Sequence, residues 1–270
     1  MKAVVDISGG FGNQLFQFSF SIFLQKRGYD VYINDQENLS YFDPKILKIK
    51  SSSNLQHKLI QLSSNNKIFQ KLFCDYYDNN SDLTNIIERN PKKYITFLNG
   101  YWQKNLYVNE NEKKIQELID SAYLKHSLTS KELRSSNSAL IHVRRTDYIK
   151  NGEILSLNYY ENSMSYLKTK KISDFYIFTD DNKWVKNQKI FSKAIHIEET
   201  PKHPREIKNT LQTFYEMQKF QNFIISNSTF SWWAAKLSNL HNGYVVCPTP
   251  FFLKEGNYNL YDSNWELIRR

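Results

Sequence analysis

The segment HVRRTD, at residues 142–147, places two arginines side by side where an apolar stretch ends. The stretch before it, SALIHV, is typical of a buried strand. Side chains alternate along a strand, so His142 and Arg144 should lie on one face and Arg145 on the other. Arginine is rarely buried without a partner, so the pair requires an anion, and a guanidinium group matches a phosphate through two parallel hydrogen bonds.

Acidic residues accompany these arginines. Asp147 is placed to hold one arginine in its rotamer, so a structural Arg–Asp pair at a strand end is the alternative to a phosphate site. Asp180 and Asp181 follow another strand but lack the D-x-D spacing of a metal–nucleotide clamp, and capping of the next helix is their plainest role. Glu198 and Glu199 end a further strand in the same way. One acid at such a strand end could accept hydrogen bonds from guanine, and the sequence alone does not say which.

A glycine-rich turn, GGFGNQ at residues 9–14, follows the first strand and opens a helix. It departs from the dinucleotide-binding fingerprint, because Leu15 occupies the third glycine position. Amide side chains beside the N–H groups of a helix start suit a phosphate or a hydroxyl-rich ligand, whereas the alternative is a plain tight turn. The residues expected at such a ligand are Gly10, Gly12, Asn13 and Gln14.

A hydroxyl-rich turn lies in ISNSTFSWWAA, at residues 225–235, between a strand and a helix. Ser228 and Thr229 are good helix caps, and capping is the commonest role of such residues. They are also a second anion site, since a helix N-terminus carries partial positive charge. Trp232 and Trp233 are expected in the core.

The order of elements predicts an α/β protein. A strand at 2–8, a helix at 14–28 and a strand at 29–34 form a strand–helix–strand unit. Residues 40–95 indicate short helices, and the polar, serine-rich stretch 125–138 is the expected domain boundary. The strands expected beyond it cover 139–144, 174–180, 194–199, 222–227 and 243–248, with helices at 158–170 and 207–220. This alternation is typical of parallel sheets covered on both faces, in two Rossmann-like domains that face a cleft.

Composition narrows the class of protein. Hydrophobic residues make up 40% of the 270 residues, so global disorder is excluded. The formal charge of +9 could suit nucleic acid, but no nucleic-acid-binding signature accompanies it. Two distant cysteines, Cys74 and Cys247, indicate neither a metal site nor a disulfide framework. No signal peptide or membrane-spanning stretch is expected, which predicts a cytoplasmic protein.

Taken in order, the segments GGFGNQLFQ, GYWQ, HVRRTD, FTDD and SNSTFSWWAA resemble the α-1,2-fucosyltransferases of glycosyltransferase family 11. The resemblance covers about residues 3–250, and the later segment YDSNW is similar to the closing part of that family. Each segment alone is moderately specific, and the five in order are strongly specific.

The resemblance implies an enzyme of the GT-B fold, with two Rossmann-like domains facing a central cleft. Residues 1–130 would form the acceptor-side domain and residues 131–270 the domain that binds the GDP-sugar. The implied reaction moves L-fucose from GDP-β-L-fucose to the 2-hydroxyl of a galactose, with inversion and without a metal or other cofactor. A related transferase using another nucleotide sugar on the same scaffold is the alternative.

The resemblance also implies roles for individual residues. Arg144 would contact the β-phosphate, with Arg145 and Asp147 shaping the site, and His142 would lie near the guanine. The residues around the phosphates would be Ser228, Thr229 and Phe230, and those near the fucose Gly10, Gly12, Asn13 and Gln14. We expect catalytic roles for Arg144, Asn13 and Asp147, and ligand contacts from the others and Glu198.

The acceptor and the proton acceptor are less defined. Bacterial relatives commonly decorate lipid-linked O-antigen or capsule units that end in galactose, and a basic surface suits such a substrate at the inner membrane surface. Asp6 precedes the glycine-rich turn but is expected to face away, so it is not assigned as the base. The departing diphosphate could instead take the proton.

Overall fold

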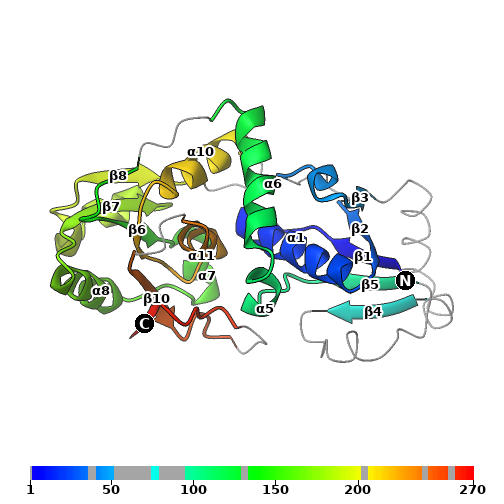
Figure 1. Cartoon of the computed structure of the whole chain (residues 1–270). Coiled ribbons are helices and arrows are strands. Elements are labelled where there is room, and N and C mark those ends of the chain that lie inside the picture. The colour runs from blue at the N-terminus through cyan, green and yellow to red at the C-terminus, as the bar shows by residue number, and fades with distance from the viewer. Residues whose placement is uncertain are drawn as a thin grey trace. The chain divides into compact units, whose positions relative to one another are not determined.

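The computed structural model describes residues 2–35, 41–51, 74–78, 95–128, 133–201, 206–238, 243–254 and 259–270 (Figure 1). The chain forms two compact units, one of Met1–Ala122 with Gly256–Asn259 and one of Tyr123–Glu255 with Leu260–Arg270. The expected boundary between residues 130 and 131 lies outside the described residues. Asn259 joins the first unit because its carbonyl accepts a hydrogen bond from Asn105 N at 2.8 Å.

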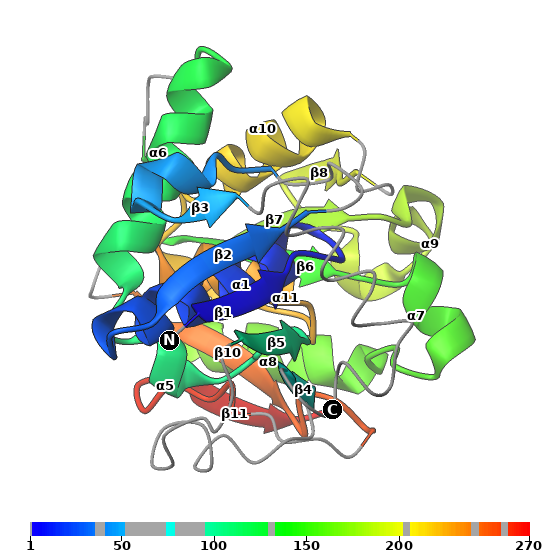
Figure 2. The same ribbon diagram turned by 90° about the vertical axis from the view of Figure 1, so that its right-hand side faces the viewer.

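The first unit contains a parallel sheet with the strand order β3-β2-β1-β5-β4 (Figure 2). Its strands are β1 (Lys2–Asp6), β2 (Asp30–Asn34), β3 (Lys50–Ser51), β4 (Cys74–Asp78) and β5 (Ile95–Asn99). Its helical segments are α1 (Phe11–Lys26), η1 (Pro44–Leu47), α5 (Asn105–Val108) and α6 (Glu112–Lys125), the last of which runs into the second unit. The expected strand–helix–strand start is confirmed.

Helix α1 is buried on almost every side, as its apolar sequence predicts. It begins at Phe11, earlier than expected, so Gly12 and Asn13 belong to its first turn rather than to the preceding loop. Of the short helices expected in residues 40–95, the described residues contain only η1, and much of that stretch lies outside them. Strand β4 was not expected from the sequence.

The second unit contains a parallel sheet with the order β11-β10-β9-β6-β7-β8. Its strands are β6 (Ser138–Val143), β7 (Asp174–Thr179), β8 (His196–Glu199), β9 (Asn222–Ile224), β10 (Val245–Thr249) and β11 (Glu266–Arg269). Its helical segments are α7 (Thr146–Asn151), α8 (Leu157–Thr169), α9 (Asn182–Lys186), η2 (Lys189–Phe191), α10 (Ile207–Met217) and α11 (Thr229–Lys236). All the strands expected here are confirmed, and β11 is an addition.

Both sheets are Rossmann-like, because each reverses its strand order beside its first strand. The reversal falls between β1 and β5 in the first unit and between β6 and β9 in the second. Open α/β sheets bind ligands in the crevice at the carboxyl ends of such strands. The glycine-rich turn after β1 and the segment HVRRTD after β6 therefore both lie at these positions.

The core of the second unit is dense and aromatic. Trp232 and Trp233 are fully buried in α11, as expected, and their rings pack edge to face. Tyr159 and Tyr160 of α8 are buried beside β6 and β9, where the Tyr159 hydroxyl donates to Ile225 O at 2.6 Å. Among the described residues, no helix is both long and apolar enough to cross a bilayer.

The backbone of the glycine-rich turn depends on Gly9. Its φ of +74° lies in the left-handed region, and a Cβ there would stand 2.9 Å from Asn13 Nδ2 and 3.0 Å from a Tyr101 ring carbon. Gly10, by contrast, has φ −77°, and a Cβ there would meet nothing within 4 Å. The fold therefore requires glycine at position 9 and not at position 10.

We expect Gly9→Ala to lower the free energy of unfolding by about 1–3 kcal/mol, through backbone strain and displacement of Asn13. Gly10→Ala should change it by less than about 1 kcal/mol, because the new methyl group enters open space. Urea unfolding of the two variants measures the difference. Equal losses in both would show that the turn does not depend on the left-handed residue.

Candidate active site

Arg144 is held from both sides at the carboxyl end of β6. Its Nε lies 2.9 Å from Asp147 Oδ1 and 3.2 Å from Asp180 Oδ2. Burial alone would lower the pKa of Arg144, but the two carboxylates outweigh that effect and raise it. The guanidinium is therefore charged, and both carboxylates hold it through Nε. The Asp147 contact matches the role expected for this residue.

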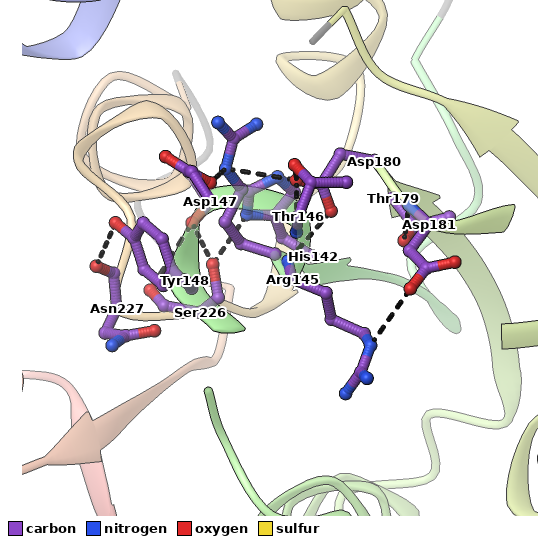
Figure 3. Close-up of polar contacts among 12 residues, drawn as sticks. His142, Arg145, Thr146, Asp147, Tyr148, Thr179, Asp180, Asp181, Ser226 and Asn227 are labelled. Carbon is purple, nitrogen blue, oxygen red and sulfur yellow. Dashed lines mark hydrogen bonds and ion pairs between the residues drawn. The ribbon is translucent and has the colours of Figure 1, made fainter. Parts of the chain in front are cut away.

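Asp180 organises the segment that carries the two arginines. It is fully buried at the end of β7, and its carboxylate accepts hydrogen bonds from Arg145 N at 2.8 Å and from Thr146 N at 3.1 Å. The Thr146 hydroxyl donates to the same carboxylate at 2.5 Å (Figure 3). The expectation that Asp180 caps a helix is wrong. The signal available in the sequence for this role was an acid placed directly after a buried strand. That this strand, β7, neighbours β6 is seen only in the structure.

Its neighbour Asp181 does cap α9, as expected, by accepting a hydrogen bond from Trp184 N at 3.1 Å. It also contacts Arg145, whose Nε lies 3.2 Å from Asp181 Oδ2. The Arg145 guanidinium stacks over the Trp184 ring, 3.7 Å from its centroid. Arg145 and Arg144 thus diverge, as strand alternation predicts, and these contacts make Arg145 part of the site framework.

His142 is buried on β6 and crosses to the neighbouring strand end. Its Nδ1 lies 2.7 Å from the Ser226 hydroxyl, which follows β9, so the pair spans the point where the strand order reverses (Figure 3). Burial, with a smaller contribution from Arg144, lowers the pKa of His142 to about 3. The imidazole is therefore neutral at physiological pH. Its Nε2 is buried and has no hydrogen-bond partner among the described residues.

The segment after β9 leads into α11. Ser228 is the N-cap residue, but its hydroxyl makes no cap bond, so the expectation that these hydroxyls simply cap the helix is wrong at this position. Asn227 is fully buried, and its backbone carbonyl accepts a hydrogen bond from the Tyr148 hydroxyl at 3.0 Å. Phe230 packs between Phe214 and His142, with ring centroids 5.4 and 6.2 Å away. Thr229 is the first residue of α11.

Glu198 lies in a different part of the same sheet edge. Its carboxylate is 2.9 Å from His196 Nε2, and both side chains are about half exposed. A hollow of about 330 Å³ adjoins it at the end of β8 and the start of α10. Its polar lining includes Glu198, Glu199, Thr200, Glu206, Asn209 and Gln212. This hollow offers several acceptors for N–H groups of a ligand.

In the first unit, the glycine-rich turn meets the segment after β5. Gln103 Nε2 donates to Asn13 Oδ1 at 3.0 Å, and Gln17 Nε2 donates to Gly100 O at 2.9 Å. Gln17 Oε1 also accepts from Ser8 N at 3.0 Å. The bonds to Asn13 and Gly100 join GGFGNQLFQ and GYWQ across the strand reversal. No local sequence signal marked Gln17 for this role.

Gln14 differs from its neighbour Asn13 in exposure. Its side chain is fully buried, with Nε2 donating to Gly9 O at 3.1 Å and Oε1 accepting from Tyr41 N at 3.0 Å. It therefore stabilises the turn from within, and a ligand contact of its side chain is not favoured by this geometry. Gly10 and Asn13 are partly exposed, whereas Gly12 is buried.

Asp6 ends β1 beside the glycine-rich turn. Asn34 Nδ2 on β2 donates to Asp6 Oδ1 at 2.6 Å. Burial raises the pKa of Asp6, and the bond from Asn34 offsets this only in part. Asp6 shares its strand face with Val4, which packs with Tyr32 and Phe97. The bond from Asn34 thus ties the Asp6 carboxylate to β2.

Among the described residues, no group of three or more His, Cys, Asp or Glu side chains could hold a metal ion. The charged groups that meet at the second reversal point are instead arginines and their carboxylate partners. The arrangement fixes Arg144 as a positively charged group at this position.

Comparison with known proteins shows the family. The model of "Glycosyl transferase family 11" matches residues 2–269. An alpha-1,2-colitosyltransferase from Escherichia coli is 29% identical, over 99% of this chain and 99% of the relative. The O-antigen biosynthesis glycosyltransferase WbnK, also from Escherichia coli, is 23% identical, over 96% of this chain and 98% of the relative.

A solved structure agrees in fold. A mutant of FUT1 from Arabidopsis thaliana in complex with GDP superposes with a TM-score of 0.56 at 11% identity. The match covers 91% of this chain and 70% of that one. The expected GT-B class, with two parallel α/β units, is thus confirmed. The match of the family model along nearly the whole chain shows that this protein is a member of glycosyltransferase family 11, the α-1,2-fucosyltransferase family.

Proposed function

We propose that this glycosyltransferase moves L-fucose from GDP-β-L-fucose to the 2-hydroxyl of a galactose, with inversion at the anomeric carbon. The acceptor would be a unit of a bacterial surface polysaccharide. Membership of family 11 supports the sugar transfer, and the GDP complex of the FUT1 structure supports a GDP-sugar as the donor. The name of the colitosyltransferase supports an α-1,2 linkage.

The geometry of Arg144 carries this proposal. Asp147 and Asp180 both contact its Nε, which leaves the two terminal nitrogens of the fork for a ligand. When the bond from the sugar to the diphosphate lengthens, negative charge grows on the β-phosphate. A guanidinium already fixed in place stabilises that charge without reorganising, so its effect is larger in the transition state than in the ground state.

His142 suits the guanine end of the donor. Its neutral imidazole is buried and bonded through Nδ1 to Ser226, so it would shape this end of the site rather than contact the base through Nε2. The acidic hollow at Glu198 could accept the N1–H and the amine of guanine. Ser228, Thr229 and Phe230 would lie around the phosphates, near the positive end of α11.

The first unit would act on the sugar and the acceptor. We propose that Gly10 and Asn13, both partly exposed at the glycine-rich turn, contact the fucose. The buried Gly12 lies between them in the chain. The geometry of Asp6 does not favour it as the base that takes the acceptor proton. We therefore propose that the departing diphosphate receives this proton, as a highly dissociative transition state permits.

The identity of the sugar has one specific competitor. Colitose differs from L-fucose only by lacking the 3-hydroxyl, and one relative is a colitosyltransferase. A site that hydrogen-bonds a hydroxyl rejects the analogue without it by about 10⁴–10⁵, whereas an apolar site discriminates much less. The relative named for O-antigen biosynthesis and the charge of +9 support a lipid-linked acceptor near a membrane surface.

A donor comparison tests the proposed sugar. We expect GDP-β-L-fucose to give an α-1,2-fucosylated product from a β-galactoside, at a kcat/KM at least about tenfold above that of GDP-colitose or GDP-mannose. Product linkage is checked by NMR. Preference for GDP-colitose would show that the donor sugar is colitose and not fucose, and would leave the membership of family 11 unaffected. The absence of transfer from every GDP-sugar would refute the donor class.

We expect the activity to survive EDTA. The reason is that Arg144 supplies positive charge at the diphosphate, where a metal ion would otherwise be needed. Initial rates with and without chelator, at matched ionic strength, measure this. An enzyme that loses activity in EDTA and regains it with Mn²⁺ would show that the arginine is insufficient.

Arg144→Lys should be almost as damaging as Arg144→Ala. Lysine keeps the charge but lacks the planar fork that Asp147 and Asp180 hold at one edge while the other faces the ligand. We expect each variant to lose about 10²–10³ in kcat. Arg134→Lys, which changes an arginine that lies over Tyr176, serves as the matched control. Near-normal turnover in Arg144→Lys would mean that a point charge suffices.

His142 should make stability fall in acid. The unfolded imidazole takes up a proton near pH 6.5, whereas the folded one resists until about pH 3. The stabilisation is therefore present above pH 6.5 and is lost as the pH falls towards 3, at up to about 1.4 kcal/mol per pH unit for one proton. Urea unfolding of the native chain and of His142→Gln at pH 7 and pH 5 measures this. The same slope in both proteins would contradict the assignment.

A further inference from the structure

A buried ion pair lies behind the segment that leads into α11. Glu153 follows the end of α7, and Arg270 Nη1 lies 2.7 Å from its Oε2. Both side chains are more than nine-tenths buried, at 8% and 6% exposure. Because charged side chains are rarely buried this deeply, the pair requires an explanation.

The guanidinium group of Arg270 donates hydrogen bonds to several acceptors at once. Besides the carboxylate, Nη2 donates to Glu153 O at 2.7 Å and to Ile154 O at 3.2 Å. Nη1 also reaches Phe251 O at 3.4 Å. A flat guanidinium can satisfy such a set from one position, whereas a lysine cannot. Arg270 therefore fixes the backbone after α7 and not only a charge.

The carboxylate of Glu153 is equally well engaged. It accepts hydrogen bonds from Leu253 N at 3.0 Å and from Lys254 N at 3.3 Å. Burial would raise the pKa of Glu153, but Arg270 and these N–H groups outweigh it and lower the pKa. The residue is therefore ionised. Its carboxylate contacts three separate stretches of the chain, at residues 227, 253–254 and 270.

The pair reaches the candidate active site through Asn227. The Asn227 Nδ2 donates to Glu153 O at 2.8 Å and lies 3.3 Å from Glu153 Oε2. The backbone carbonyl of the same Asn227 accepts a hydrogen bond from the Tyr148 hydroxyl (Figure 3). The centroid of the Tyr148 ring lies 5.9 Å from the Arg144 guanidinium carbon. Asn227 thus stands between Glu153 on one side and the arginine segment on the other.

The neighbours of Asn227 in the sequence are both site residues. Ser226 bonds to His142, and Ser228 is the N-cap residue of α11. A shift of Asn227 would therefore move the partner of the imidazole and the start of the helix together. The Asn227 side chain is held by the backbone carbonyl and the carboxylate of Glu153, so the position of this segment depends on the ion pair.

We infer that Glu153 and Arg270 are positioning residues of the donor site, which act through Asn227 on the segment 226–228 and on Tyr148. The inference rests on the proposed GDP-sugar site in this unit. A buried ion pair often adds nothing to the free energy of unfolding, or lowers it, when compared with apolar residues. Holding the segment 226–228 in one position is therefore a better reason for the presence of this pair than stability.

The test compares Arg270→Lys with Lys236→Met. Lys236, the last residue of α11, forms another largely buried ion pair in the same unit, 2.5 Å from Asp262. GDP affinity is measured by calorimetry at a temperature where both variants are folded, together with the melting temperature. We expect Arg270→Lys to weaken GDP binding by about 10- to 100-fold, because small misplacements of a site cost up to about 10²-fold. Lys236→Met should lower the melting temperature and leave GDP affinity unchanged.

If Arg270→Lys does not fold, the double variant Glu153→Gln with Arg270→Met replaces it. No buried charge is then left unpaired, and the glutamine oxygen can still accept from Leu253 and Lys254. Weakened GDP binding in either form, with normal binding in Lys236→Met, supports the inference. Normal GDP affinity in the folded variant overturns it and leaves the proposed function intact. Failure of the native chain to bind GDP overturns the proposed function, and the inference with it.

Discussion

The buried carboxylate of Asp180 is the constraint on which the second unit's site depends. A carboxylate with no exposed surface must be compensated by donors, and here the donors are two backbone N–H groups, one hydroxyl and the Arg144 Nε. All of them belong to the three residues that follow β6. The neighbouring strand therefore fixes the path of the arginine segment, and α7 starts from that fixed point. Asp147 and Tyr148 take their positions from this start.

Both units place their functional candidates where the strand order reverses, but they use different chemistry. In the second unit the contacts that cross from one strand end to the next involve a histidine and a serine, with arginines beside them. In the first unit the crossing contacts come from the amide side chains of Gln17 and Gln103. Charged groups suit a diphosphate, and neutral amides suit sugar hydroxyl groups. The division of labour proposed for the two units follows from this contrast.

The site is prepared before any ligand arrives. Arg144 is held by two carboxylates, His142 is kept neutral by burial, and Asn227 is held by Glu153. Fixing these groups in the folded state removes the reorganisation that would otherwise oppose charge development on a leaving diphosphate. An enzyme built in this way can stabilise the departing group with protein cations. This arrangement is the physical reason for proposing that arginine supplies the charge stabilisation in this family 11 protein.

The sequence by itself determined the strands of the second unit other than β11, the glycine-rich turn, and the positions of HVRRTD and SNSTF at the ends of buried strands. It could do so because alternation, apolar runs and turn residues are local properties of the chain. The same local signals led to errors where a side chain had two local uses. Asp180 and Ser228 both stand where a helix cap is common, and neither acts as one. The burial of the Gln14 side chain within the glycine-rich turn is a further feature that no local signal showed.

Only the tertiary structure decided which strands are neighbours, and the site depends on that choice. The order β11-β10-β9-β6-β7-β8 puts β6 between β7 and β9, so Asp180 reaches the arginine segment from one side and Ser226 reaches His142 from the other. Arg270 meets Glu153 although 117 residues separate them. No local pattern encodes such contacts, because each depends on a buried polar group finding its partner after the sheet has formed. The residue types were therefore readable from the sequence, and their partners were not.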